Sequence, residues 1–317
     1  MPYSHRYDPE TDVDLVTGPE LDLMVRRKGA EVVELTWKRP DQDPTGLIWR
    51  NGVLDPPDDG FWPRHAPVLF PVVGGLHDNR SRTTDGVDVR FPGLHGLARH
   101  ASFGLSGASG GEHSFLLVYR LDADRETRAL FPWEFALTIV YTLRERELEL
   151  NVTVLNADNR PMPFQLGWHP GFPAPFGEGN KADCHLRLPR GRITRVFADG
   201  DCRLTGETEV LEGGGDFPFT EGGLDGTYLF DLSGIEPEQR VVELMDPDES
   251  LGVRVGLAGY PHLGLWSDAN APFVCIEPWQ GMDDSVKQEP FDQKFGIVTL
   301  PPGGRDFRSA WIEAVGG

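Results

Sequence analysis

The sequence predicts an all-β protein, a large antiparallel β-sandwich. Apolar and polar residues alternate over 147–154 and 251–257, which is the period of a half-buried strand. The 38 glycines and 27 prolines are spread along the chain and cut it into short elements, as turns between strands do. No stretch keeps the 3.6-residue apolar period of a substantial helix.

The remaining expected strands are runs rich in β-branched and aromatic residues, at 113–121, 135–143, 193–198 and 295–300. No internal repeat and no low-complexity linker divides the 317 residues. We therefore expect one domain over 1–317, with residues 1–20 as a candidate peripheral N-terminal segment.

Charge and cysteine content narrow the class of protein. Fifty acidic against thirty basic residues give a net charge of −20, which disfavours nucleic acid and anionic membrane surfaces as partners. No apolar run is long enough to span a membrane. Cys184, Cys202 and Cys275 are odd in number and widely spaced, which argues against a disulfide framework and a structural zinc site. With no visible secretory signal, we expect a cytoplasmic protein.

Two segments in the first third of the chain depart from plain strand patterning. In 61–75, Arg64 precedes an apolar run between prolines; a solvated Arg-His pair before a buried strand is the simpler interpretation. In 91–103, His95 precedes a glycine, so the chain is free to make a tight turn, and Arg99 follows four residues later. A metal site would need a third ligand nearby, and an isolated loop histidine is more often an ordinary surface residue.

The segment 164–177 combines His169 with three prolines and several aromatic residues. Proline fixes φ, so this loop would lose little entropy on ordering around a ligand. Trp168 offers a flat apolar face of the kind that packs on a sugar ring, but a proline-rich corner whose aromatics fill the core explains the pattern equally well.

The segment 271–284 is the most informative. Glu277 directly follows an apolar run and precedes a proline and Trp279. A glutamate is rarely buried without a partner, and desolvation beside Trp279 would raise its pKa toward neutrality, which suits a general base. The alternative is a strand-end glutamate paired with an arginine. The position of Glu277 within the apolar pattern favours the functional interpretation.

Together these segments resemble the aldose 1-epimerase (galactose mutarotase-like) superfamily. The matching motifs are WPRHAPVLFPVVG at 62–74, HGLARHASF at 95–103, GWHPGF at 167–172, GYPHLGLWSDANAPFVCIEPWQG at 259–281 and KFGIVTLPPGG at 294–304. The forms HGLAR and CIEPW look most like the LacX-type and hexose-6-phosphate mutarotase branches. Gly171 departs from the family pattern, in which a tyrosine often follows the HP pair, and this change would widen the pocket.

The resemblance implies a β-supersandwich that interconverts the α and β anomers of an aldohexose or a hexose phosphate without a metal or organic cofactor. It makes Glu277 the base that removes the C1 hydroxyl proton, and His169 the acid that protonates the ring oxygen. His95 would polarise the ring oxygen. We further expect an acidic site to keep His169 charged near neutrality.

The expected substrate contacts follow from the same resemblance. Arg99 would orient the sugar, and Arg64 and Arg99 would together bind a phosphate group. Asp225 is the candidate for the hydroxyl-binding aspartate of the superfamily. Trp168 and Trp279 are the candidate ring-stacking residues.

Two other classes of function stay open at this point. One is a catalytically silent carbohydrate-binding or regulatory protein on the same fold, because the motifs can serve binding alone. The other is a glycoside hydrolase or lyase. A hydrolase normally needs two carboxylates, and the possible partners of Glu277, Asp283 and Asp284, lie in a polar stretch that we expect to be exposed.

Overall fold

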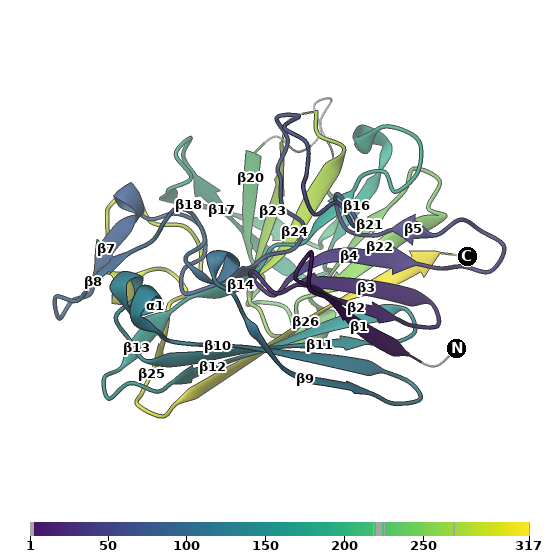
Figure 1. Ribbon diagram of the computed structural model, residues 1–317. Helices are drawn as coiled ribbons and strands as arrows, with labels where there is room; N and C mark the ends of the chain where they lie inside the picture. The colour runs from purple at the N-terminus through teal and green to yellow at the C-terminus, as the bar shows by residue number, and fades with distance from the viewer. Residues whose placement is uncertain (1–2, 218, 220–223, 225, 269, 317) are drawn as a thin grey trace.

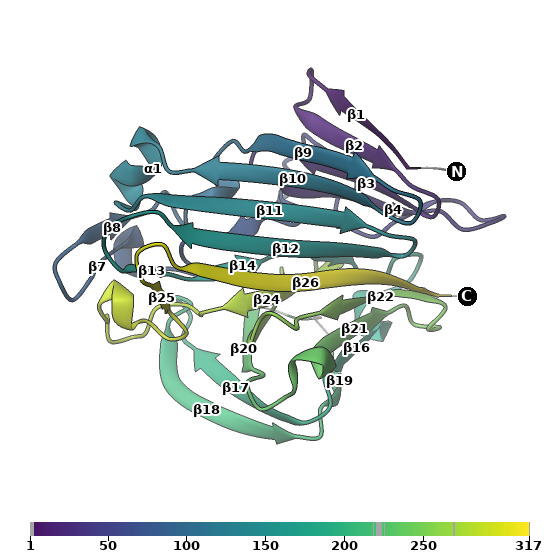
Figure 2. The ribbon, with the colours of Figure 1, turned by 90° about the horizontal axis from the view of Figure 1, so that it is seen from below.

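Two large antiparallel sheets face each other and enclose the core (Figure 1). The computed structural model describes residues 3–217, 219, 224, 226–268 and 270–316. In this part of the chain the first sheet has nine strands, and Figure 2 shows them side by side. In spatial order they are β19 (Gly215–Phe217), β16 (His185–Leu188), β21 (Val241–Met245), β22 (Leu251–Gly256), β26 (Arg305–Gly316), β12 (Glu147–Asn156), β11 (Phe135–Leu143), β10 (Phe115–Asp122) and β9 (Gly104–Gly110).

The second sheet has eight strands in the described residues. Seven run in the order β18, β17, β20, β23, β24, β14 and β6, and the eighth, β15, pairs with β24. Their bounds are β18 (Leu204–Glu212), β17 (Arg192–Ala198), β20 (Gly226–Asp231), β23 (His262–Ser267), β24 (Phe273–Gln280), β14 (Leu166–Trp168), β15 (Gly171–Pro173) and β6 (Val68–Leu69). This sheet carries the candidate site.

Smaller elements complete the structure. A five-stranded N-terminal sheet runs in sequence order through β1 (Ser4–Asp8), β2 (Val13–Thr17), β3 (Leu21–Arg26), β4 (Glu31–Trp37) and β5 (Thr45–Gly46). Two short pairs join β13 (Met162–Phe164) to β25 (Val298–Leu300) and β7 (Arg80–Arg82) to β8 (Asp88–Arg90). The helices are α1 (Arg125–Leu130) and the 3₁₀ turns η1 (His77–Asn79), η2 (Ala98–His100), η3 (Lys181–Asp183), η4 (Pro237–Gln239) and η5 (Phe291–Gln293).

The predicted all-β class is confirmed, and so are the strands expected from alternation. Along β12 the residues alternate strictly between half-buried and buried, because successive side chains point to opposite faces of a strand. The expected absence of a substantial helix also holds in the described residues, where α1 has six residues.

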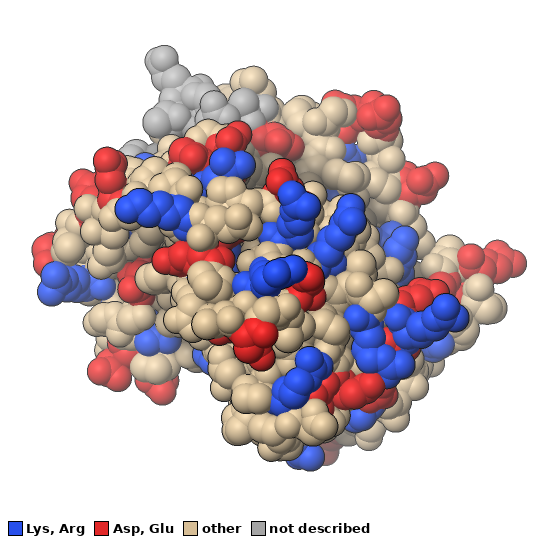
Figure 3. Space-filling view, turned by 90° about the vertical axis from the view of Figure 1, so that its left-hand side faces the viewer, with Lys and Arg blue, Asp and Glu red and all other residues tan. Residues whose placement is uncertain are grey.

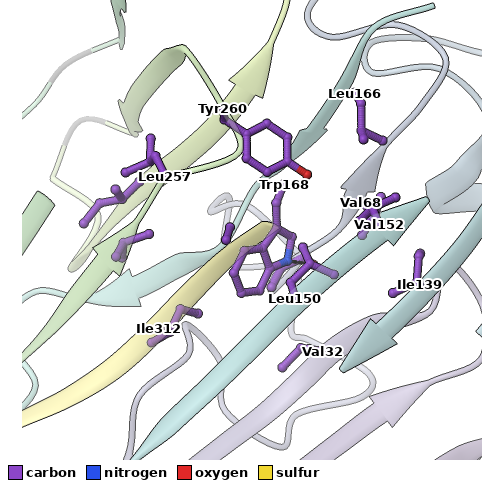
Figure 4. Close-up of a cluster of buried hydrophobic side chains, with 14 of the residues drawn as sticks. Val32, Val68, Ile139, Leu150, Val152, Leu166, Trp168, Leu257, Tyr260 and Ile312 are labelled. Carbon is purple, nitrogen blue, oxygen red and sulfur yellow. Dashed lines mark hydrogen bonds between the residues drawn. The ribbon is translucent and has the colours of Figure 1, made fainter. Parts of the chain in front are cut away.

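The core fills the space between the sheets (Figure 4). Ile139 and Leu150 of the nine-stranded sheet face Val68 and Leu166 of the eight-stranded sheet, and all four are fully buried. The N-terminal segment joins this framework through Asp14, which is also buried and accepts a 3.0 Å hydrogen bond from the Tyr119 hydroxyl of β10.

The surface carries both signs of charge. Figure 3, which views the end of the molecule where β7 and β8 lie, shows basic side chains scattered among acidic ones. On that hairpin Arg80 pairs with Asp78, and Arg82 pairs with Asp88. In the described residues, no helix has the length and apolar character needed to cross a membrane.

Candidate active site

A cavity of about 160 Å³ opens on the face of the eight-stranded sheet that is turned away from the core. It brings together five of the residues that the sequence singled out: His95, Arg99, His169, Glu277 and Trp279. They come from three separate segments of the chain, 91–103, 164–177 and 271–284. The rest of the lining consists of Gly74, Leu94, Cys202, Thr227, Trp266 and Asp283.

The centre of the cavity is the pair His169 and Glu277. Gly167 of β14 lies opposite Trp279 of β24, so in the same antiparallel register residue 169 lies opposite residue 277. The His169 Nε2 atom is 3.2 Å from Oε2 of Glu277. The two residues are 5% and 1% exposed, so this contact is almost shielded from water.

Trp279 lies two residues after Glu277 and therefore points to the same face of β24. Its indole N–H donates a 3.1 Å hydrogen bond to Oε2 of Glu277. Gly167 and Gly264 flank it on the neighbouring strands, and a Cβ at either position would lie 2.9 or 3.1 Å from the indole ring. The two glycines therefore let the indole lie flat against the sheet and reach the carboxylate.

His95 is held by the backbone of a tight turn. It has a φ of +65°, and the following Gly96 has a φ of +74°. Gly96 packs closely on Phe70, because a Cβ at this position would lie 2.4 Å from the Phe70 carbonyl oxygen. The Gly74 N–H donates a 3.0 Å hydrogen bond to Nδ1 of His95. Since Nδ1 accepts, the proton of the neutral ring sits on Nε2, which is thereby a hydrogen-bond donor.

Burial controls the protonation of the central pair. It raises the pKa of Glu277 well above its ordinary value, and the charge of Asp283 adds to this effect. Burial also lowers the pKa of His169 to about 3, with the charge of Arg99 acting in the same direction. The expectation that the site keeps His169 charged near neutrality is wrong, because desolvation disfavours the imidazolium. Of the two groups, Glu277 therefore holds a proton more tightly than His169 does.

Arg99 faces the cavity from η2, and Arg64 lies near it. Burial lowers the pKa of Arg99 to about 10, and the neighbouring charge of Arg64 contributes. The Nε atom of Arg99 is buried and has no hydrogen-bond partner among the described residues. Arg64 is 4.0 Å from the buried carboxylate of Glu31, which also binds Arg26 at 2.6 Å. Arg64 does not line the cavity and is a neighbour of the site rather than part of its wall.

The prediction that Trp168 stacks on the sugar is wrong. Trp168 is fully buried between the two sheets (Figure 4). Its indole N–H donates a 3.0 Å hydrogen bond to the Ala66 carbonyl. Successive residues of a strand point to opposite faces, so the register that turns His169 toward the cavity turns Trp168 into the core.

Two other tryptophans, which the sequence analysis did not select, pack against the His169 ring. The Trp62 ring stacks on the His169 ring, with centroids 4.6 Å apart and an interplanar angle of 22°. Trp266 lines the cavity and meets the His169 ring edge-on at 5.9 Å. The space beside Gly171 is not empty either, because a Cβ there would lie 2.9 Å from the Trp62 ring. The WPRH motif contained Trp62, but its contact with His169 spans more than one hundred residues.

Asp283 and Asp284 are buried, contrary to the expected exposure of their polar stretch. They are 4% and 2% exposed. Asp283 lines the cavity and accepts a 2.8 Å hydrogen bond from the Gly75 N–H, while Asp284 pairs with the buried Lys294 at 3.2 Å. Burial raises the pKa of Asp283 to about 6. Asp225 lies outside the described residues.

Donor atoms of the kind that hold a metal ion also meet at the site. In the described part of the chain, one such group consists of His169, Cys275 and Glu277, whose donor atoms lie within 4.8 Å of one another.

Comparison with known protein families finds a match to the aldose 1-epimerase family over residues 15–306. Protein LacX of Lactococcus lactis subsp. lactis is 28% identical over 259 residues, which cover 78% of this chain and 82% of LacX. A galactose mutarotase related enzyme from Lactobacillus acidophilus has a TM-score of 0.83 at 25% identity, covering 96% of this chain and 97% of that one.

A galactose mutarotase-like protein from Lactobacillus casei ATCC 334 has the same fold, with a TM-score of 0.79 at 24% identity over 96% of this chain and all of that one. The buried Glu-His pair is thus set in a sandwich shared with mutarotase-like proteins, and the match extends over nearly the whole chain. The protein belongs to the aldose 1-epimerase family, and its relatives include the LacX proteins.

Proposed function

We propose that the protein is an aldose 1-epimerase, a mutarotase that interconverts the α and β anomers of an aldohexose or a hexose phosphate. The contact of 3.2 Å between His169 Nε2 and Glu277 Oε2 carries this proposal. Mutarotation moves a proton between two oxygens bonded to the same carbon, so its acid and its base must lie side by side.

One proton shared by Glu277 and His169 is enough for the reaction, and it is on Glu277 both before and after ring opening. For ring opening, the proton passes from Glu277 to His169; Glu277 then takes the proton of the C1 hydroxyl while His169 gives its proton to the ring oxygen. The electrons of the broken O–H bond form the C1 carbonyl, and those of the C1–ring oxygen bond stay on the ring oxygen. The pair ends with one proton on Glu277, the member whose pKa burial raises.

Closure runs the same steps backward. After rotation about the C1–C2 bond, Glu277 protonates the aldehyde oxygen while His169 takes the proton of the attacking hydroxyl, so the other anomer forms. The Nε2–H of His95 would donate a hydrogen bond to the ring oxygen and stabilise charge that develops there. General acid–base catalysis of this kind contributes about 10²–10⁴-fold in rate.

Arg99 supports an anionic or polyhydroxyl substrate. Its buried Nε lacks a partner among the described residues, so a substrate oxygen would satisfy it. In a hexose phosphate, the phosphate would pair with this guanidinium, and Arg64 would strengthen the local positive field despite the net charge of −20.

The test is anomer exchange, measured by NMR or polarimetry on glucose, galactose and glucose 6-phosphate. We expect wild type to exceed the buffer rate and Glu277→Gln to lose at least 10²-fold of that excess while keeping its circular dichroism spectrum. The fastest sugar identifies the substrate. Saturable sugar binding without rate acceleration would overturn the proposal in favour of a silent binding protein.

A further inference from the structure

The strand register sets a cysteine beside the catalytic pair. Cys275 and Glu277 are two residues apart on β24 and so project from the same face. Gly171 lies opposite Cys275, which makes His169 the direct neighbour of Glu277 and the diagonal neighbour of Cys275. One donor atom from each of the three side chains lies within 4.8 Å of the other two.

These donors are not committed to structural bonds. The Nε2 atom of His169 lies 3.2 Å from Glu277, within the group itself, and its Nδ1 atom is buried without a hydrogen-bond partner among the described residues. Cys275 is a free, fully buried cysteine. Glu277 accepts from Trp279, which occupies only part of its capacity because an ionised carboxylate has about four acceptor sites. His169 and Glu277 line the cavity, whereas Cys275 is fully buried and does not, so a cation would reach the group past His169 and Glu277.

We propose that His169, Cys275 and Glu277 form an inhibitory site for a thiophilic divalent cation, of which Zn²⁺ is the type. Nitrogen, sulfur and carboxylate oxygen are the donors that zinc prefers, and tetrahedral zinc holds them about 3.5 Å apart. The present separation of up to 4.8 Å requires the donors to close by about 1 Å on binding.

Charge balance favours the ion in this buried place. On binding, the Cys275 thiol and the Glu277 carboxyl release their protons to solvent, and two anionic donors then neutralise the doubly charged cation. Three protein donors leave the fourth coordination position facing the cavity, where water would bind. The complex is neutral overall, as a desolvated site requires.

Inhibition follows from the proposed function, on which this part of the inference rests. The cation takes the lone pairs with which Glu277 accepts the C1 proton and His169 carries it. It also occupies the volume in which C1 would sit. Zn²⁺ should therefore act competitively with the sugar, and sugar should protect the enzyme.

Direct binding is tested with Co²⁺, which reports a sulfur ligand by a thiolate-to-cobalt charge-transfer band in the near ultraviolet. We expect one equivalent to give this band in wild type and in Cys202→Ala, and Cys275→Ala to lose it. Cys202 is the matched control because it lines the same cavity. No band in wild type, a band that survives Cys275→Ala, or a band lost in Cys202→Ala overturns the site, whatever the enzyme's activity.

Inhibition is tested by anomer exchange under a Zn²⁺ titration. Cys275→Ala should keep kcat within threefold and raise the half-inhibitory Zn²⁺ concentration at least tenfold, whereas Cys202→Ala should leave the half-inhibitory concentration unchanged. If Cys275→Ala does not fold, Cys275→Ser replaces it in both measurements, with circular dichroism as the check. An unchanged half-inhibitory concentration in the folded variant refutes the inhibitory role even where Co²⁺ binds.

Discussion

At Gly74, the addition of a single methyl group should leave the protein folded but reduce its activity. It has a φ of +68°, its N–H binds His95, and the next N–H, of Gly75, binds Asp283. A Cβ at Gly74 would lie 2.2 Å from Oδ1 of Asp283 and 2.9 Å from its Cα. Because a backbone atom is among the contacts, rotation of the Asp283 side chain cannot relieve the overlap.

The expected cost of Gly74→Ala has two parts. A left-handed conformation costs an alanine about 1–2 kcal/mol. Losing the hydrogen bond between Gly75 and Asp283 adds about 1 kcal/mol, since the carboxylate is buried. We therefore expect the free energy of unfolding to fall by about 2–3 kcal/mol in urea titrations. A shift of the turn by about 1 Å also misplaces His95, which predicts a loss of roughly 10²-fold in kcat/KM.

The control for Gly74→Ala is Gly86→Ala. Gly86 also has a positive φ, +93°, but a Cβ there meets no atom within 4 Å. This variant carries the backbone strain alone, so it should lose about 1–2 kcal/mol and keep its full rate of anomer exchange. If folded Gly74→Ala retains kcat/KM within twofold of wild type, the turn does not position His95 and the reasoning is refuted.

Three further predictions concern pH and charge. Burial alone would raise the pKa of Glu31, but hydrogen bonds from His65 and the charge of Arg26 lower it to about 2, so the free energy of unfolding should fall by about 3 kcal/mol from pH 5 to pH 2. Urea titrations of Glu31→Gln should lack that part of the fall. At high pH, kcat/KM should fall as Glu277 and His169 lose their shared proton. Asp283→Asn should move this fall to lower pH, because the charge of Asp283 raises the pKa of Glu277. A pH–rate profile in which the fall does not move would contradict this. Glu277→Gln should raise the free energy of unfolding at pH 7 by about 0.5–2 kcal/mol but not at pH 4, because a carboxyl whose folded pKa is raised loses stability as pH rises above its unfolded value.

The period of two residues made much of this structure predictable. It gives β12 and β22 directly, and it makes Glu277 conspicuous within an apolar run. The same rule, applied to the pair Trp168 and His169, places them on opposite faces. The error over Trp168 therefore came from weighing aromatic composition above alternation, and the sequence contained the means to avoid it.

Contacts between distant segments were beyond the reach of local patterns. The polar neighbours of Asp283 in the sequence predict that it is exposed. In the structure it accepts a hydrogen bond from the Gly75 N–H, 208 residues away. Trp62 stacks on His169 from a loop that shows no strand period. Burial of a polar residue depends on partners that only the tertiary fold supplies, so local polarity predicts exposure wrongly where such partners exist.

The burial of Asp283 in the cavity reopens the comparison with glycoside hydrolases, and the spacing of acid and base answers it. Hydrolases place two carboxyl groups about 5 Å or more apart, on either side of the bond that breaks. Here the His169 imidazole lies 3.2 Å from the same Glu277 oxygen that accepts the Trp279 N–H. A pair this close cannot flank a bond, but it can pass one proton between two oxygens of a single carbon. Asp283 fits this arrangement as a neighbouring charge that helps keep the proton on the pair.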